Sequence, residues 1–198
     1  VGSEMCIRDS YSTIQRNAER ILQLVNQLMD IRKIDKGQMS LMFKKAEIVS
    51  FTRDLLETFE QQTRVKKLDL KFHTSAPEIE MWIDPKNFDK IILNLLSNAC
   101  KFTPENGQVE ISLSTGEDTH LPQNAPLRRY VELTVADSGI GIASTEREHI
   151  FERFYQIRNS QNNSNIGTGI GLHLTRSLVE LHYGNIHVED NGEGRPGS

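Results

Sequence analysis

The chain lacks several features that would each define a class of protein. Its two cysteines, Cys6 and Cys100, have no spacing typical of a metal or redox site, which indicates a reducing compartment. No apolar run approaches the length of a membrane-spanning helix, and no long Lys/Arg block marks a nucleic-acid surface. With 198 residues, 37% of them hydrophobic, and a net charge of −4, the sequence predicts a soluble cytoplasmic segment of one ordinary domain plus an appendage, without a nucleic-acid partner.

Residues 91–104, IILNLLSNACKFTP, place three polar side chains among apolar ones at helical spacing. If Asp84-Pro85 starts this helix, then Asn94, Asn98 and Lys101 share one face. An amide oxygen can coordinate a hard cation, and an ammonium group can neutralise a phosphate. On its own, the stretch also fits an amphipathic helix with a solvated polar face. The opposing apolar stripe is predicted to contain Phe88, Ile92, Leu95, Ala99 and Phe102.

A strand signal leads into a first glycine-containing loop. Apolar residues alternate over 130–135, and Asp137-Ser138-Gly139-Ile140-Gly141-Ile142 follows directly. This pattern predicts a strand that ends in an acidic residue and a flexible loop. Taken alone, Asp137 also fits a residue that only forms a turn.

A second glycine segment, Gly167-Thr168-Gly169-Ile170-Gly171-Leu172, precedes an amphipathic stretch over 174–181. Glycines just before a helix expose backbone N–H groups at its positive end, where phosphate binds. Gly184 is predicted to end this helix in the left-handed conformation. Neither a Walker lysine-serine pair nor the dinucleotide GxGxxG pattern follows, so this segment alone is weak evidence.

The order of four segments is far more specific. The asparagine helix, DSGIGI, IFERFYQ at 150–156 and GTGIGL together resemble the ATP-binding domain of sensor histidine kinases from about residue 11 onward. In that family these segments are the N box, first glycine box, F box and second glycine box. The resemblance implies a two-layer α/β sandwich with a mixed sheet, preceded by a long dimerisation-type helix.

The resemblance also implies roles for individual residues in binding ATP and Mg²⁺. Asn98 would be the magnesium ligand, Asn94 would occupy the other family asparagine position, and Lys101 would approach the phosphates. Asp137 would accept a hydrogen bond from the adenine amino group, while Gly139 and Gly141 would let the loop close against the base.

The remaining implied roles concern the phosphates and the lid. The second glycine box would cradle the phosphates, and the F box would belong to a mobile lid over the nucleotide. The aromatic pair of that lid fits a packing role equally well. The residues concerned are Gly167, Thr168, Gly169, Gly171 and Leu172 in the glycine box, and Phe151, Arg153 and Phe154 in the F box.

Three regions are expected along the chain. Residues 1–10 lack the periodicity that follows and are predicted to be a non-native flank. Residues 11–37 carry apolar residues at steps of four and three, which resembles the second helix of the dimerisation hairpin. Such a helix needs a partner helix, although folding back on its own domain is the alternative. Residues 38–198 are predicted to be the catalytic domain, with its last strand missing.

Further elements are expected from local patterns. Strands are predicted near 40–43, 68–73, 81–83, 109–114 and 186–188, and a helix from about 50 to 66. Thr145-Glu146-Arg147-Glu148 is predicted to form a capping box for an F-box helix. Residues 159–165 are predicted to be a mobile lid tip.

The implied activity is transfer of the ATP γ-phosphoryl group to a histidine on the dimerisation hairpin, and from there to a response-regulator aspartate. The acceptor helix is expected to lie outside this chain, which should therefore bind nucleotide without phosphorylating itself. A homodimeric and membrane-anchored full-length protein is also implied. The alternative is a nucleotide-dependent switch module that transfers no phosphate. Related ATPases usually place a general-base glutamate where Asn94 stands, which counts against ATP hydrolysis.

Overall fold

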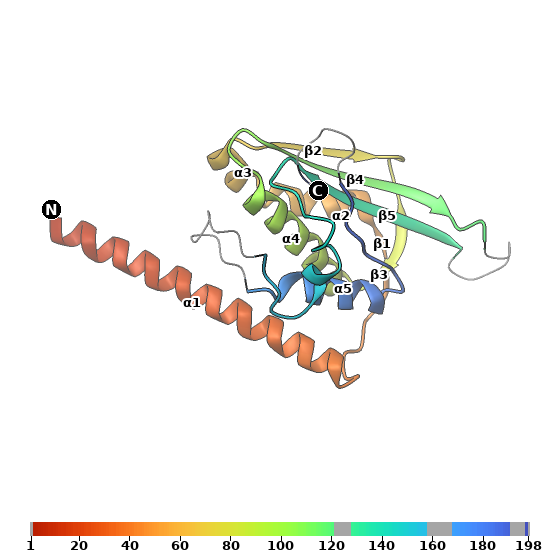
Figure 1. Ribbon diagram of the computed structural model, residues 1–198, viewed down its shortest axis with the longest axis horizontal. Helices are drawn as coiled ribbons and strands as arrows, with labels where there is room; N and C mark the ends of the chain where they lie inside the picture. Colours follow the sequence, from red (N-terminus) through yellow and green to blue (C-terminus); the bar gives the residue numbers. More distant parts are fainter. Residues whose placement is uncertain (1, 121–127, 158–167, 191–196, 198) are drawn as a thin grey trace.

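The computed structural model describes residues 2–120, 128–157, 168–190 and 197, without the side chains of residues 2–10, 12 and 16. Figure 1 shows the helices and strands in their spatial arrangement. In chain order they are α1 (Gly2–Asp35), β1 (Lys44–Glu47), α2 (Ile48–Glu57), α3 (Glu60–Lys66), β2 (Asp69–Thr74), β3 (Glu80–Ile83), α4 (Pro85–Phe102), β4 (Gln108–Glu117), β5 (Arg129–Asp137), the short 3₁₀ helix η1 (His149–Phe151) and α5 (Gly171–Leu181).

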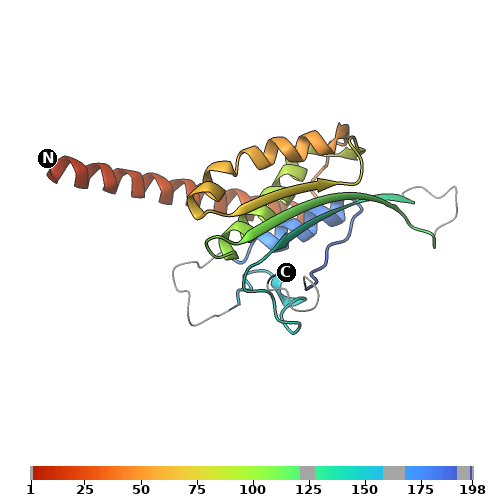
Figure 2. The same ribbon diagram turned by 90° about the horizontal axis from the view of Figure 1, so that it is seen from above.

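A three-stranded mixed sheet forms the centre of the domain. Strand β4 pairs in parallel with β2 and antiparallel with β5, while β1 and β3 form a separate antiparallel pair. Val109, Ile111 and Leu113 of β4 alternate into the core and are at most 1% exposed. Helices α2, α4 and α5 cover this face of the sheet (Figure 2). The predicted two-layer α/β sandwich with a mixed sheet is therefore confirmed.

Helix α4 begins where the sequence predicts. Asp84 has an extended backbone and accepts the backbone N–H of Asn87 at 3.1 Å, and Pro85 occupies the first helical position. Most of the predicted apolar stripe is buried or half-buried, but Phe102 is 43% exposed. Because Phe102 is the last helical residue, its side chain leaves the core and lines a cleft.

Helix α1 carries two apolar stripes. Leu24, Ile31 and Ile34 pack against the domain core, with Ile31 only 5% exposed. Ile14 and Ile21 of a second stripe are each more than 60% exposed, because the first part of α1 projects away from the domain (Figures 1 and 2). Only the end of the helix folds back on its own domain, and the predicted partner helix stays a prediction.

The boundaries of α1 bear on the expected regions of the chain. The helix runs without a break through residue 10, and the non-native origin of residues 1–10 stays a prediction. Gly37 ends the helix in the left-handed region with φ +63°, and Gln38 donates its N–H to the Lys33 carbonyl at 2.8 Å. The helix therefore stops at the position that the sequence indicates.

Two expectations in the first half of the domain were wrong in detail. The first strand lies at 44–47 instead of 40–43, because pairing with β3 places Lys44 opposite Ile83. The single helix expected over 50–66 is interrupted between α2 and α3. Phe59, at this interruption, is buried in the core, and the Thr58 hydroxyl donates a hydrogen bond to the Leu55 carbonyl at 2.6 Å.

Three expectations in the second half were also wrong. Tyr183, and not Gly184, takes the left-handed conformation after α5, with φ +63°. Residues 186–188 form no strand, because no ladder joins them to β5, which remains an edge strand among the described residues. Residues 145–148 form turns before η1 instead of a capping box, and Glu146 accepts the Tyr155 hydroxyl.

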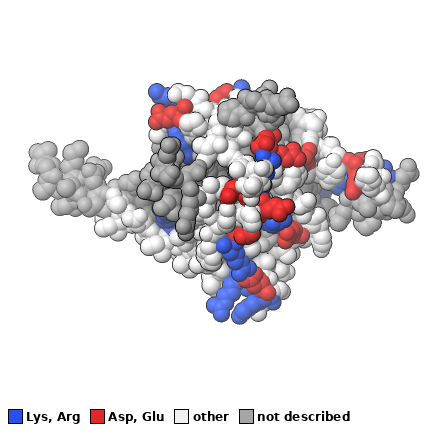
Figure 3. All heavy atoms as spheres, viewed as in Figure 1, with Lys and Arg blue, Asp and Glu red and all other residues white. Residues whose placement is uncertain are grey.

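The surface in the view of Figure 3 carries acidic and basic side chains close to one another, with no broad basic area among its coloured residues. The absence of a nucleic-acid partner stays a prediction. No helix in the described part of the chain is long and apolar enough to span a membrane.

Candidate nucleotide site

A cleft of about 1920 Å³ opens between the C-terminal half of α4, the end of β5 and the start of α5. It exceeds the roughly 300–1,000 Å³ of an ordinary small-molecule site because it continues along β5 and residues 184–190. Three segments that are far apart in the sequence meet here. The predicted site residues that line the cleft are Asn94, Asn98, Lys101, Asp137, Gly139, Gly141, Phe151, Thr168, Gly169, Gly171 and Leu172.

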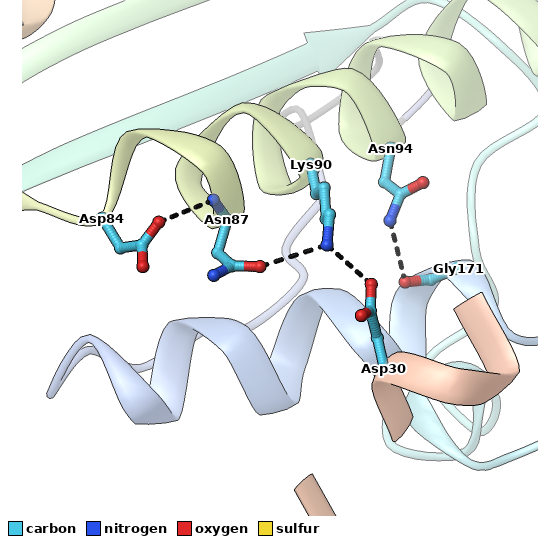
Figure 4. Close-up of polar contacts among 6 residues, drawn as sticks. All are labelled: Asp30, Asp84, Asn87, Lys90, Asn94 and Gly171. Carbon is cyan, nitrogen blue, oxygen red and sulfur yellow. Dashed lines mark hydrogen bonds and ion pairs between the residues drawn. The ribbon is translucent and has the colours of Figure 1, made fainter. Parts of the chain in front are cut away.

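Asn94 joins α4 to the second glycine segment. Its side-chain nitrogen donates to the Gly171 carbonyl and to the Thr175 hydroxyl, both at 3.3 Å (Figure 4 shows the Gly171 contact). Gly171 is the first residue of α5, whose first N–H groups have no intrahelical partner. Asn94 therefore fixes the positive end of α5 beside the cleft.

Asn98 and Lys101 lie in the last turns of α4, and both are half-buried. The Lys101 ammonium lies 4.8 Å from the centroid of the Phe102 ring. Burial lowers the pKa of Lys101, and the neighbouring positive charge of Arg20 on α1 acts in the same direction. An anion bound near Lys101 would offset both effects, so the electrostatics of this corner favour a negatively charged ligand.

The first glycine loop packs against the end of α4. Asp137 accepts the Gly139 N–H at 2.8 Å, so the turn-forming contact that the sequence allowed is present. A Cβ at Gly139 would lie 2.6 Å from the Phe102 carbonyl oxygen, and Gly141 has φ +69°. Glycine is therefore required at both positions. The contact between Asp137 and adenine stays a prediction.

The second glycine loop contacts the F box through the backbone. Gly169 has φ +68°, and a Cβ there would lie 2.6 Å from the Phe154 carbonyl carbon. Phe154 donates its N–H to the Gly169 carbonyl at 2.9 Å, and Ile170 donates its N–H to the Thr168 hydroxyl at 3.3 Å. Gly167 and the predicted lid tip lie outside the described residues.

The F-box residues separate into different roles. Phe151 is 5% exposed, lines the cleft and lies 5.1 Å from the Arg176 guanidinium, whereas Phe154 is 64% exposed. Arg153 pairs with Asp35 at the end of α1, and the resulting hydrogen bond lowers the pKa of Asp35. The structure therefore does not bring Arg153 or Phe154 to the cleft wall, because Arg153 bonds Asp35 of α1 and His173 of α5, and Phe154 is exposed.

The donor set fits a magnesium ion that is shared with a nucleotide. The described residues hold no group of three or more His, Cys, Asp or Glu side chains suited to a metal. Mg²⁺ commonly takes one or two protein oxygens and completes its shell with phosphates and water. Asn98 lines the cleft, and its amide group would supply one such oxygen.

Two further cations line the cleft but carry no sequence signal. Arg20 reaches it from α1, and Lys66 reaches it from the end of α3. Neither belongs to a recognisable motif, because each approaches the site only through tertiary packing.

The comparisons with known proteins agree with this geometry. A model of the family described as histidine kinase-, DNA gyrase B-, and HSP90-like ATPase matches residues 83–197. Sensor histidine kinase TmoS of Ectopseudomonas mendocina is 38% identical over 180 residues, which cover 91% of this chain and 17% of TmoS. Full-length ShkA, solved in complex with AMPPNP, is 25% identical with a TM-score of 0.76, over 96% of this chain and 36% of ShkA.

A third comparison shows the fold alone. Histidine kinase ThkA, solved in complex with the response regulator protein TrrA, is 22% identical with a TM-score of 0.62. The match covers 86% of this chain and 45% of ThkA.

The chain belongs to the histidine kinase-, DNA gyrase B-, and HSP90-like ATPase family. Within that family it is an ATP-binding catalytic domain of the sensor histidine kinase type.

Proposed function

We propose that the cleft binds Mg-ATP with the adenine against Asp137 and the triphosphate near Asn98, Lys101 and residues 167–172. The meeting of α4, the loop after β5 and the described residues of the second glycine segment in one cleft is the observation that carries the proposal. Phosphoryl transfer asks a protein mainly for positioning and charge neutralisation, which one cation and the first N–H groups of α5 supply. Bound Mg²⁺ would offset charge on the phosphate oxygens, held on the protein side by Asn98.

The same proposal extends to a longer protein, since this chain spans only 17% of TmoS. There the γ-phosphoryl group is transferred from ATP to an imidazole nitrogen of a histidine on the dimerisation hairpin, leaving ADP, and then to a response-regulator aspartate. The exposed stripe of α1 with Ile14, Ile21 and Leu28 suits a hairpin partner in a homodimer. ThkA, solved with a response regulator, supports that class of partner. Membrane anchoring of the longer protein belongs to the same proposal.

Isothermal titration calorimetry with AMPPNP and Mg²⁺ tests the binding site. Asp137→Asn is expected to weaken binding about tenfold, because the amide can present N–H groups where adenine needs an acceptor. Asp54→Asn, at an exposed position on α2, is the matched control and should bind like the parent. Parent-like binding by Asp137→Asn would contradict the adenine assignment.

Radiolabelled ATP tests the transfer. This chain alone is expected to gain no acid-labile phosphate, whereas a histidine-bearing hairpin supplied in trans should become labelled. Labelling of His149 or His173 in the chain itself would contradict the proposal. An unlabelled hairpin together with tight ATP binding would instead favour the switch module.

A further inference from the structure

The C-terminal end of α4 is held by a lysine from another helix. Lys66 is the last residue of α3, and its ammonium donates to the carbonyl oxygens of Cys100 at 2.8 Å, Lys101 at 3.0 Å and Thr103 at 2.6 Å. An ammonium group has three N–H donors. All three are therefore directed to carbonyls at one helix end, and none is left for a phosphate.

These contacts meet a need that every helix end has. The last four carbonyls of an α-helix have no intrahelical partner, and the C-terminus carries the negative end of the helix dipole. At α4 the Ala99 carbonyl is satisfied by the N–H and hydroxyl of Thr103, at 3.0 and 2.6 Å. Lys66 supplies charge-assisted bonds to the next two carbonyls and to Thr103 itself, and such bonds are stronger than neutral ones.

The helix end that Lys66 holds is the part of α4 that forms the nucleotide site. Asn98 and Lys101 lie in its last turns and line the cleft. The Phe102 carbonyl abuts Gly139 so closely that a Cβ there would lie 2.6 Å away. A shift of this helix end would therefore move the proposed magnesium ligand, the phosphate-facing lysine and the first glycine loop together.

We propose that Lys66 is a positioning residue of the nucleotide site: by binding three carbonyls at the end of α4, it sets Asn98 and Lys101 against the loop at 137–141. This inference rests on the proposed function of the cleft. It assigns the site a residue from outside the four boxes, on a helix that no motif of the sequence marks. Lys66 acts through α4 and not through a contact with the ligand.

Calorimetry with Mg-AMPPNP on the 198-residue chain tests this inference. Lys66→Met is expected to lower the affinity about tenfold, measured where circular dichroism shows a folded protein. Lys67→Met is the matched control. Lys67 is the next residue and its side chain is exposed, so this variant removes the same charge outside the helix contact and should bind like the parent. Val49→Ala controls for lost stability, because it leaves a cavity where the buried Val49 side chain of α2 packs in the core. This variant should also keep the affinity.

A second variant separates geometry from charge. Lys66→Arg keeps the charge, but its planar donors cannot reproduce the lysine geometry at three carbonyls, so the affinity should fall about threefold. Parent-like affinity in Lys66→Arg or in Lys66→Met would overturn the positioning role, and so would an equal loss in Val49→Ala. If the parent itself fails to bind Mg-AMPPNP, the proposed function fails and this inference with it. Binding by the parent together with parent-like binding by Lys66→Met removes this inference alone.

Discussion

The two halves of α4 carry similar polar side chains, but those in the first half stabilise the fold and two in the second half face the cleft. In the first half, Asp84 caps the helix, and Lys90 binds both Asp30 of α1 at 2.6 Å and the Asn87 amide oxygen at 3.1 Å (Figure 4). In the second half, Asn98 and Lys101 face the cleft. Spacing along the helix is alike in both halves, so the environment that tertiary packing provides decides which polar residues hold the protein and which are available to a ligand.

The largest effect is expected at the cleft-facing half. Asn98→Ala in α4 should reduce phosphoryl transfer to a hairpin supplied in trans by about 100-fold or more, because one preorganised charge-stabilising contact is lost. It should also remove the magnesium dependence of AMPPNP binding measured by calorimetry. Gln61→Ala, which removes an exposed amide of α3 that does not line the cleft, is the control. An equal magnesium dependence in Asn98→Ala and the parent would remove Asn98 from the ligand set.

The next largest effect is expected at the N-terminal cap of α4, in its first half. Asp84→Ala loses the acceptor of two backbone N–H groups, those of Met42 at 2.8 Å and Asn87 at 3.1 Å. We expect a loss of about 2 kcal/mol in the free energy of unfolding, measured with urea. Asp89→Ala, in the second turn of the same helix, is the comparison. A loss no larger than that of Asp89→Ala would show that the cap is not what secures this half.

A smaller effect is expected at the contact between α4 and α1. Lys90→Met should lower the free energy of unfolding by about 1 kcal/mol, because Asp30 is left with only 16% of its side chain exposed and without its cation. Lys86→Met, at an exposed position one turn earlier, should change little. Nucleotide affinity should be unaffected by either change. If Lys90→Met weakened nucleotide binding as strongly as Asn98→Ala, the division between the two halves would not hold.

The smallest effect is a pH dependence of stability from Asp84. Burial acts to raise the pKa of this carboxyl, but the N–H groups of Met42 and Asn87 outweigh it and lower the pKa below its ordinary value. The folded pKa is thus the lower one, so the contribution is complete above the unfolded pKa of about 3.9 and is lost as the pH falls below it. Urea unfolding between neutral and acidic pH should show less pH dependence in Asp84→Asn. An unchanged pH profile would contradict this assignment.

Local sequence was sufficient for the parts of the molecule whose causes are local. The cap at Asp84, the start of α4 at Pro85 and the end of α1 before Gly37 depend on neighbouring residues, and the structure has the first two where they were predicted. The four ordered boxes also predicted which segments would meet in a cleft, although the ligand roles of their residues stay predictions. Phe154 and Arg153 show the limit, since the box alone did not indicate that they turn away from the cleft.

The sequence by itself indicated the family through the order of four short motifs, and that resemblance implied the mixed α/β fold and the segments that line the cleft. Only the tertiary structure decided that Lys66 binds the end of α4, that Arg153 pairs with Asp35, and that residues 186–188 remain outside the sheet. The Lys66 and Arg153 contacts join residues far apart in the chain, as pairing of residues 186–188 with β5 would have done. Their energies depend on which surfaces pack together, and no local pattern records that choice.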